Sequence, residues 1–314
     1  NRPIRVGVDG EKVMSTESSY YVPEQSKLPV LAALGMGLMA YGAGSWVQGG
    51  SALVLLAGAI VMVFTLYNWF STVIHENMAG MNSAQLKRSY VWGMSWFIFS
   101  EVMFFACFFG ALFYVRVLAL PWLGGEGGHA GNDLLWEGFE PAWPLMTTPD
   151  MAVNGENAQF MGPEQHMSFP GWANLLGWLP LWNTIVLLSS SVTVHIAHTA
   201  LKNSNRAKFN LWLGVTVLLG AIFIVLQVEE YIHAYQHMGL TLVSGIYGTT
   251  FFMLTGFHGA HVTMGTIMLL IMFLRGLKGH FSPDDQFGFE AASWYWHFVD
   301  VVWVGLFIFV YVLA

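Results

Sequence analysis

Seven long apolar stretches alternate with shorter polar segments along the chain. They run over residues 28–47, 51–74, 84–118, 171–201, 209–233, 240–274 and 287–314. An α-helix needs about 20 apolar residues to cross the hydrocarbon core of a bilayer. The pattern therefore predicts an all-α integral membrane protein with seven transmembrane helices, several of them long enough to tilt or to project past the headgroups.

Two segments fall outside this pattern. Residues 1–27 form a polar tail without the apolar run of a signal peptide. Residues 119–170 are rich in Gly, Pro and Trp, carry acids but no Lys or Arg, and predict an irregular connection with one to two helical turns. We interpret this connection as a solvated acidic loop or as a docking or packing surface for a neighbouring subunit. Residues 28–118 and 171–314 then form a single membrane domain.

Composition and charge support a membrane location and give an orientation. Only 10% of the residues are charged and 55% are hydrophobic, whereas a soluble domain carries about a quarter charged residues. Seven spans place eleven of the twelve Lys and Arg residues on one side and leave only Arg116 on the other. The positive-inside rule therefore predicts an N-terminus in the cytoplasm (or matrix) and a C-terminus outside. No basic tract suggests nucleic acid, and the lone Cys107 is expected to be a small buried hydrophobe.

Glu101 is the clearest candidate for a functional residue within the membrane. It lies about 20 Å along its predicted helix from Arg88, which places it near the bilayer centre. Ionisable residues at this depth are costly, and their presence favours a functional role. Glu101 is interpreted either as a carboxylate with a proton-related role or as a structural acid that is hydrogen-bonded to another helix.

Histidine and acid pairs raise the alternative of a metal site. His258 and His261 have HxxH spacing, and Glu230 and His233 have the ExxH spacing of di-metal helix bundles. These pairs lie at different depths, so interhelical hydrogen bonds explain them better. The predicted polar network comprises Glu229, Glu230, His233, His258, His261, Glu290, His297 and Asp300. Glu290, His297 and Asp300 are expected to face the sixth span and to pair with its histidines.

Two further patterns concern helix packing and the membrane surface. The first span contains the small-xxx-small pairs Ala33/Gly37 and Ala40/Gly44, which predict close packing of the first two helices. A charged collar of Glu76, Arg275, Lys278 and His280 is expected at the inner surface, where such groups set topology or bind lipid phosphates.

Three sequence stretches together resemble the signature of subunit III of the haem-copper oxidases. They are SEVMFF at 100–105, YGTTFF at 247–252 followed by TGFHGAHV at 255–262, and FGFEAASWYWHFVDVVW at 287–303. The similarity covers residues 28–314 apart from 119–170. The resemblance implies two helix bundles, formed by spans 1–2 and 3–7, that are separated by a V-shaped cleft holding phospholipids.

The resemblance also implies a function. The chain would be a non-catalytic subunit of a bacterial aa3-type cytochrome c oxidase in the inner membrane, with a periplasmic 119–170 loop and C-terminus. It would hold no redox centre, metal or other cofactor, because the haems and copper belong to its partners. Those partners would be subunits I and II, with a small subunit IV as a further candidate. The family's membrane carboxylate maps onto Glu101, and its lipid-binding positions map onto Trp69, Glu76, Arg275, Lys278 and His280.

This chain departs from the family pattern near one of these positions, because His75 precedes Glu76 where relatives carry an arginine. Two other classes of membrane protein were weighed against the accessory subunit. A metallo-oxygenase would gather its histidines on one side of the membrane, and a transporter would show paired broken helices. The sequence shows neither pattern.

Overall fold

The structure is a computed structural model that describes residues 25–129, 131–282 and 286–314. The predicted polar tail lies outside the described residues, apart from its last three positions. Within the described ranges, seven helices are long and apolar enough to span a membrane. The predicted fold class, an all-α membrane protein with seven spans, is therefore confirmed.

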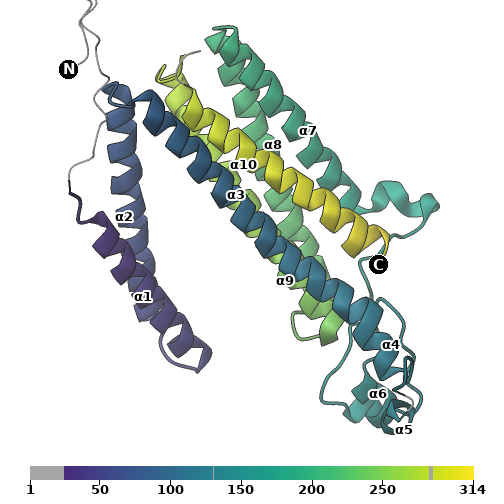
Figure 1. Cartoon of the computed structure of the whole chain (residues 1–314). Coiled ribbons are helices and arrows are strands. Elements are labelled where there is room, and N and C mark those ends of the chain that lie inside the picture. The colour runs from purple at the N-terminus through teal and green to yellow at the C-terminus, as the bar shows by residue number, and fades with distance from the viewer. Residues whose placement is uncertain (1–24, 130, 283–285) are drawn as a thin grey trace, which may run out of the picture. The chain divides into compact units, whose positions relative to one another are not determined.

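The spanning helices follow the order of the apolar stretches (Figure 1). They are α1 (Leu28–Val47), α2 (Leu53–Met78), α3 (Ala84–Phe113) continued by η1 (Tyr114–Ala119) and α4 (Leu120–Leu123), α7 (Leu179–Lys202), α8 (Arg206–His237), α9 (Gly245–Leu277), and α10 (Phe287–Leu306) continued by η4 (Phe307–Val312). Shorter elements lie in the long connection: α5 (Asn132–Leu135), α6 (Pro149–Asn154), η2 (Gly155–Asn157) and η3 (Trp172–Gly177). The chain divides into two compact units, residues 1–92 and 93–314.

In the first unit, α1 and α2 form a closely packed hairpin, as the small residues predict. The glycines at the contact are different from those expected, however. A Cβ added at Gly42 would lie 2.6 Å from Cα of Leu55, and one added at Gly58 would lie 2.6 Å from the backbone nitrogen of Met39. A Cβ at Gly37 or Gly44 would meet nothing within 4 Å. The first helix thus presents Gly35 and Gly42, seven residues apart, to its neighbour.

In the second unit, α7, α8, α9 and α10 form a ring in which each helix contacts the next. Its core is aromatic: Tyr247, Tyr295, Trp296, Trp303 and Tyr311 are all at most 1% exposed. Helix α3 runs beside this ring (Figure 1) and meets it through long side chains. Phe97, packed on Tyr295, and Phe105, packed on Phe298, recur on one face of α3.

Three sequence expectations need correction. Helix α7 begins at Leu179 rather than at residue 171, because the preceding residues form the separate η3 turn and Pro180 opens the new helix. Helix α9 begins at Gly245 rather than at residue 240, after a turn that Gly239 enters with a φ of 57°. Cys107 is exposed rather than buried. It is two residues from Phe105, so it points away from the packed face of α3 into the region where lipid would lie.

The long connection is fastened to one end of the second unit by backbone hydrogen bonds. The amides of Glu164 and Gln165 both donate to the carbonyl of Met238, at 3.0 and 3.1 Å. The amide of Met167 donates to Oη of Tyr247 at 3.0 Å, and the amide of Phe169 donates to the carbonyl of Tyr311 at 2.9 Å. The segment before α7 is therefore held on the ends of α8, α9 and η4.

Candidate functional site

Glu101 occupies the middle of the packed face of α3. Phe97, Glu101 and Phe105 succeed one another at four-residue spacing, so their side chains point in one direction. Phe105 is 2% exposed, while the side chain of Glu101 keeps 22% of its surface exposed. The carboxyl group is thus carried into the helix interface by apolar neighbours, at the edge of the second unit.

The partner of Glu101 is His261 on α9. Oε2 of Glu101 lies 2.9 Å from Nε2 of His261, and Nδ1 of the same ring lies 2.6 Å from the carbonyl oxygen of Phe257. A carbonyl only accepts hydrogen bonds, so Nδ1 carries a proton. The hydrogen bond between Nε2 and Oε2 then needs one further proton, which sits either on the carboxyl or on the ring. The pair is therefore a neutral acid beside a neutral imidazole, or a carboxylate beside an imidazolium.

Aromatic rings surround this pair. The ring of His261 lies 4.9 Å from Phe105 and 5.8 Å from Phe104 between centroids, and it stacks on Tyr295 at 6.4 Å. Such apolar walls strengthen a hydrogen bond electrostatically and make an unpaired partner costly. The arrangement can hold one proton in a defined place within the membrane-spanning part of the protein.

A second polar feature is a ladder of hydrogen bonds between α7 and α10. Nε1 of Trp303 donates to Oγ1 of Thr184, and Nε1 of Trp296 donates to Oγ of Ser190, both at 2.9 Å. Further along, Oγ of Ser191 lies 2.8 Å from Nδ1 of His297, and Nε2 of His198 lies 3.2 Å from Oε1 of Glu290. Sequence reasoning missed Thr184, Ser190 and Ser191, although Thr184, Ser191 and His198 recur every seven residues on one face of α7.

This ladder corrects the partner expected for the polar stripe of α10. Glu290 and His297 bond to α7, the fourth span, and not to the histidines of the sixth span. The physical reason is that His261 of α9 is already engaged by Glu101, and His258 contacts α10 through a 3.2 Å hydrogen bond to the carbonyl of Val299 and through the ring of Trp303. Asp300 is 4% exposed, and its carboxylate lies 3.7 Å from Nδ1 of His297.

The acids at the end of α8 have separate environments. Glu230 is 2% exposed and its Oε1 accepts a 2.7 Å hydrogen bond from Oη of Tyr311 and a 3.5 Å contact from Nε2 of Gln227. This bond ties η4 to α8 at the end where the long connection is fastened. Glu229 and His233 are exposed, and the ring of His233 lies 5.2 Å from that of His237. The structure therefore brings Glu230, but not Glu229 or His233, into the helix interface.

The predicted lipid-binding residues are divided between α2 in the first unit and the end of α9 in the second. Trp69, which is 46% exposed, and Glu76 are on α2 in the first unit. Arg275 is in the last turn of α9 in the second unit, with its Cζ 4.7 Å from the ring centre of Phe281. Lys278 caps the same helix and is exposed. Partial desolvation, together with the positive charges of Arg275 and Lys278, lowers the pKa of His280, so this end of α9 favours neutral histidine beside two cations.

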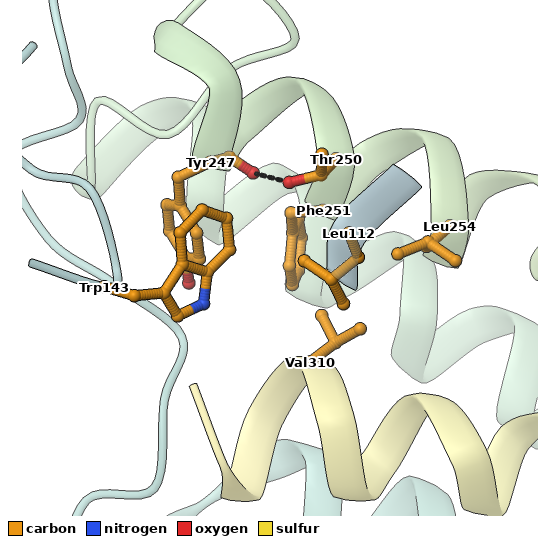
Figure 2. Close-up of a pocket in the computed structure, with 7 residues that line it drawn as sticks. All are labelled: Leu112, Trp143, Tyr247, Thr250, Phe251, Leu254 and Val310. Carbon is orange, nitrogen blue, oxygen red and sulfur yellow. Dashed lines mark hydrogen bonds between the residues drawn. The ribbon is translucent and has the colours of Figure 1, made fainter. Parts of the chain in front are cut away.

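A small apolar pocket lies where the long connection meets the helices of the second unit. Figure 2 shows Trp143 across the ring of Tyr247, with Leu112 of α3 and Val310 of η4 facing Phe251 and Leu254 of α9. Its volume is about 10 Å³, which is room for about one water molecule and too little for a cofactor or an organic substrate. The pocket is a packing feature at the joint between loop and bundle.

The donor groups do not converge on a metal centre. Among the residues that the structure describes, no three His, Cys, Asp or Glu side chains lie close enough together to hold a metal ion. The Glu101–His261 pair is accordingly the best candidate for a functional site. It combines a carboxyl group and an imidazole inside a membrane helix bundle, and their hydrogen bonds define how many protons the pair holds.

Comparison with known proteins gives a consistent result over nearly the whole chain. The sequence model of the family described as "Cytochrome c oxidase subunit III" matches residues 18–139 and 175–314. Proteins named cytochrome c oxidase subunit 3 from Hippopotamus amphibius and Equus caballus are each 36% identical over 296 residues, covering 93% of this chain and 96% of the relative. The protein of that name from Drosophila yakuba is 36% identical over 301 residues, covering 95% and 98%. The family match extends into the predicted 119–170 loop as far as residue 139.

Proposed function

The chain belongs to the cytochrome c oxidase subunit III family, and from that premise we propose that it is an accessory subunit which supports proton uptake without carrying a redox centre. As a member of this family it is a multi-pass subunit of an oxidoreductase complex of the respiratory chain. The proposal adds that the complex is of the aa3 type and that haems and copper reside in subunits I and II. This subunit packs on subunit I, and a small subunit IV is a further candidate partner.

The observation that carries the proposal is the Glu101–His261 pair. Two titratable side chains share one proton at 2.9 Å inside the membrane, where ionisable groups are expensive to keep. A group that only packed helices together could be apolar at lower cost. The retention of an acid and a base in contact favours a role in holding or relaying a proton near the surface of the second unit.

Phospholipid binding is the second part of the proposal. Trp69 and Glu76 on α2, and Arg275, Lys278 and His280 at the end of α9, carry the headgroup contacts that the family resemblance implies. The cationic end of α9, with its guanidinium held over Phe281 and its exposed lysine, supports this assignment. Lipid in this position stabilises the attachment of the subunit to its partner.

The proposed setting is the inner membrane of a bacterium. The Lys and Arg distribution supports a cytoplasmic N-terminus and a periplasmic C-terminus. In this orientation the long connection, which carries acids but no Lys or Arg, faces the periplasm. It then offers an acidic surface on the side where a soluble cytochrome c would approach an oxidase.

Purification of the oxidase with and without this chain tests the proposal. The complex that lacks the chain should retain haem and copper and should reduce oxygen at first, while its proton uptake declines during continuous turnover. Metal analysis of the separated chain should give no stoichiometric iron or copper. A redox metal bound to the separated chain, or unchanged proton uptake in its absence, would overturn the assignment.

A further inference from the structure

A groove lies beside the turn that joins α7 to α8, and its lining shares no residue with the sites described above. It has a volume of about 300 Å³. Its polar lining comes from His195 and Thr199 on α7, Asn203 and Asn205 in the turn, and Lys208 in the first turn of α8. Ile196 and Ala200, one helical turn apart on α7, add an apolar strip to the lining. The groove therefore combines polar groups with an apolar strip.

The segment that forms the groove carries charges of one sign. Residues 195–208 contain Lys202, Arg206 and Lys208 and no acid. Of these three cations, only Lys208 lines the groove. The guanidinium of Arg206 extends to the end of α9, where its Nη1 lies 3.1 Å from the position that a Cβ on Gly279 would take. Glu290 on α10 is bonded to His198. The described lining of the groove thus offers nitrogen donors and one ammonium group, and no carboxylate.

The turn that forms the groove is fixed by its own hydrogen bonds. The amide of Asn205 donates to the carbonyl of Ala200 at 2.9 Å, and Oδ1 of Asn205 accepts the amide of Lys208 at 3.0 Å. Ser204 between them has a φ of 57°, a conformation that costs energy for a residue other than glycine. The groove is therefore preformed, so a ligand does not have to order the loop on binding.

We propose that this groove binds the phosphate of an anionic phospholipid at the basic surface of the membrane. A phosphodiester offers only acceptor oxygens and one negative charge, which matches the Lys208 ammonium and the amide and imidazole nitrogens. The apolar strip receives the first methylene groups of an acyl chain. A zwitterionic headgroup adds an ammonium or choline group, for which the lining provides no carboxylate. The site is thus specific for a net negative headgroup such as that of phosphatidylglycerol.

This site is separate from the lipid contacts proposed at Trp69, Glu76 and residues 275–280. It depends on the folding of α7 and α8 alone and does not require a proton-related role of Glu101. A test must therefore read out this groove rather than the total lipid of the complex. Photoactivatable lipid analogues give such a local signal, because the peptide that carries the adduct can be mapped.

The experiment uses the intact oxidase complex in nanodiscs with a diazirine-bearing phosphatidylglycerol or the matching phosphatidylcholine. Adduct yield on residues 195–208 should be about fivefold higher with phosphatidylglycerol, since one basic group near an anionic headgroup contributes about that factor. Lys208→Gln should remove this preference. Lys202→Gln, which deletes the same charge from the same turn outside the groove, should change the yield by less than about twofold. Ser204→Gly, which relieves the turn without changing charge, should leave the yield unaltered.

Several results would overturn the proposal. Equal labelling by the two lipids in the unaltered complex would exclude a preference for an anionic headgroup, whether or not any variant assembles. Equal losses in Lys202→Gln and Lys208→Gln would reduce the effect to the general positive potential of this surface. Loss of labelling when millimolar inorganic phosphate is present before and during irradiation would identify a free-anion site instead. Labelling that persists in the presence of phosphate supports a lipid as the source of the phosphate group.

Discussion

Nε2 of His261 lies 2.9 Å from Oε2 of Glu101, while Nδ1 of the same ring is bonded at 2.6 Å to the carbonyl of Phe257. Because the carbonyl fixes one proton on Nδ1, the imidazole and the carboxyl group together hold a single further proton. Transfer of that proton between them changes the charge distribution without changing the net charge of the pair. The contact also joins α3 to α9, so it links the third span to the helix ring.

This geometry predicts different effects for two substitutions of the acid. Glu101→Ala leaves Nε2 of His261 without its partner and should lower the free energy of unfolding by about 1–3 kcal/mol. Glu101→Gln offers an amide N–H to the same nitrogen and should cost less than Glu101→Ala. Denaturant titration of the purified complex in detergent, followed by tryptophan fluorescence, measures both. If Gln is as damaging as Ala, the hydrogen bond to His261 is not what stabilises the contact.

Close packing of α1 on α2 predicts a contrast between two glycines of the same helix. Gly42→Ala would place a Cβ 2.6 Å from Cα of Leu55 and should destabilise the hairpin by about 1–3 kcal/mol through overpacking. Gly44→Ala meets nothing within 4 Å and should be neutral or slightly stabilising, since alanine favours helix more than glycine. The midpoint of thermal unfolding of the complex distinguishes them. Equal midpoints would mean that the two helices do not approach through Gly42.

Sequence reasoning predicted the seven spans and the close α1–α2 pair, but not which glycines form the contact. The mean hydropathy of about 20 residues shows that a segment can lie in the hydrocarbon core of a bilayer. It does not show how the helix is rotated about its axis. The choice between Gly37 and Gly35 depends on rotation, which the partner helix sets through side-chain packing. The wrong prediction that Cys107 is buried has the same origin. An apolar side chain in a membrane helix is stable either in the protein interior or against lipid, so its hydropathy does not predict burial.

The ladder between α7 and α10 predicts that a buried serine matters more than its exposed neighbour. Ser190→Ala removes the acceptor of the Trp296 indole N–H and should cost about 1–3 kcal/mol, because that donor is then buried without a partner. Ser189 is exposed, so Ser189→Ala should change stability by less than about 0.5 kcal/mol. Unfolding of the two variants in parallel gives the comparison. Similar losses in both would argue that the tryptophan bond contributes little.

The hydrogen bonds of Asp150 predict that the stability of this part of the long connection depends on pH. Its carboxylate accepts hydrogen bonds from the amides of Gln159 at 2.6 Å and Phe160 at 2.9 Å, and from Nδ2 of Asn154 at 2.7 Å. These bonds, of which the one from Phe160 has the largest effect, lower the pKa of Asp150 below its ordinary value. Stabilisation of the loop is therefore complete above the unfolded pKa of about 3.9 and is lost as the pH falls through the lowered folded pKa.

Hydrogen exchange at neutral pH tests this role of Asp150. Asp150→Asn should speed exchange of the Gln159 and Phe160 amides, because a neutral amide oxygen is a weaker acceptor than a carboxylate. Glu156→Gln removes a charge from the neighbouring η2 turn and serves as the control, with exchange at both amides unchanged. Unaltered protection in Asp150→Asn would show that other contacts hold this part of the connection.

The candidate site was predictable in part. The sequence indicated Glu101 and His261 separately, because each is a costly polar residue in an apolar span. Their pairing depends on which face α3 turns toward α9, and the hydropathy of the two helices carries no signal for that. Glu290 and His297 were expected to face α9 and to pair with its histidines. In the structure they meet His198 and Ser191 of α7, because the faces that α7 and α10 turn toward each other depend on side-chain packing, which the residue types alone do not reveal.

Proton uptake by the reconstituted oxidase during continuous turnover is the most direct test of the central claim, that the Glu101–His261 pair supports proton transfer. A pH-sensitive dye on the uptake side of vesicles reports the rate, and haem content verifies assembly. Glu101→Gln, which retains size and hydrogen bonding but removes the titratable group, should lower sustained uptake while haem content stays intact. His261→Gln should give the same loss. Unchanged uptake in Glu101→Gln, together with weakened assembly in Glu101→Ala, would contradict the account and leave the pair a purely structural contact.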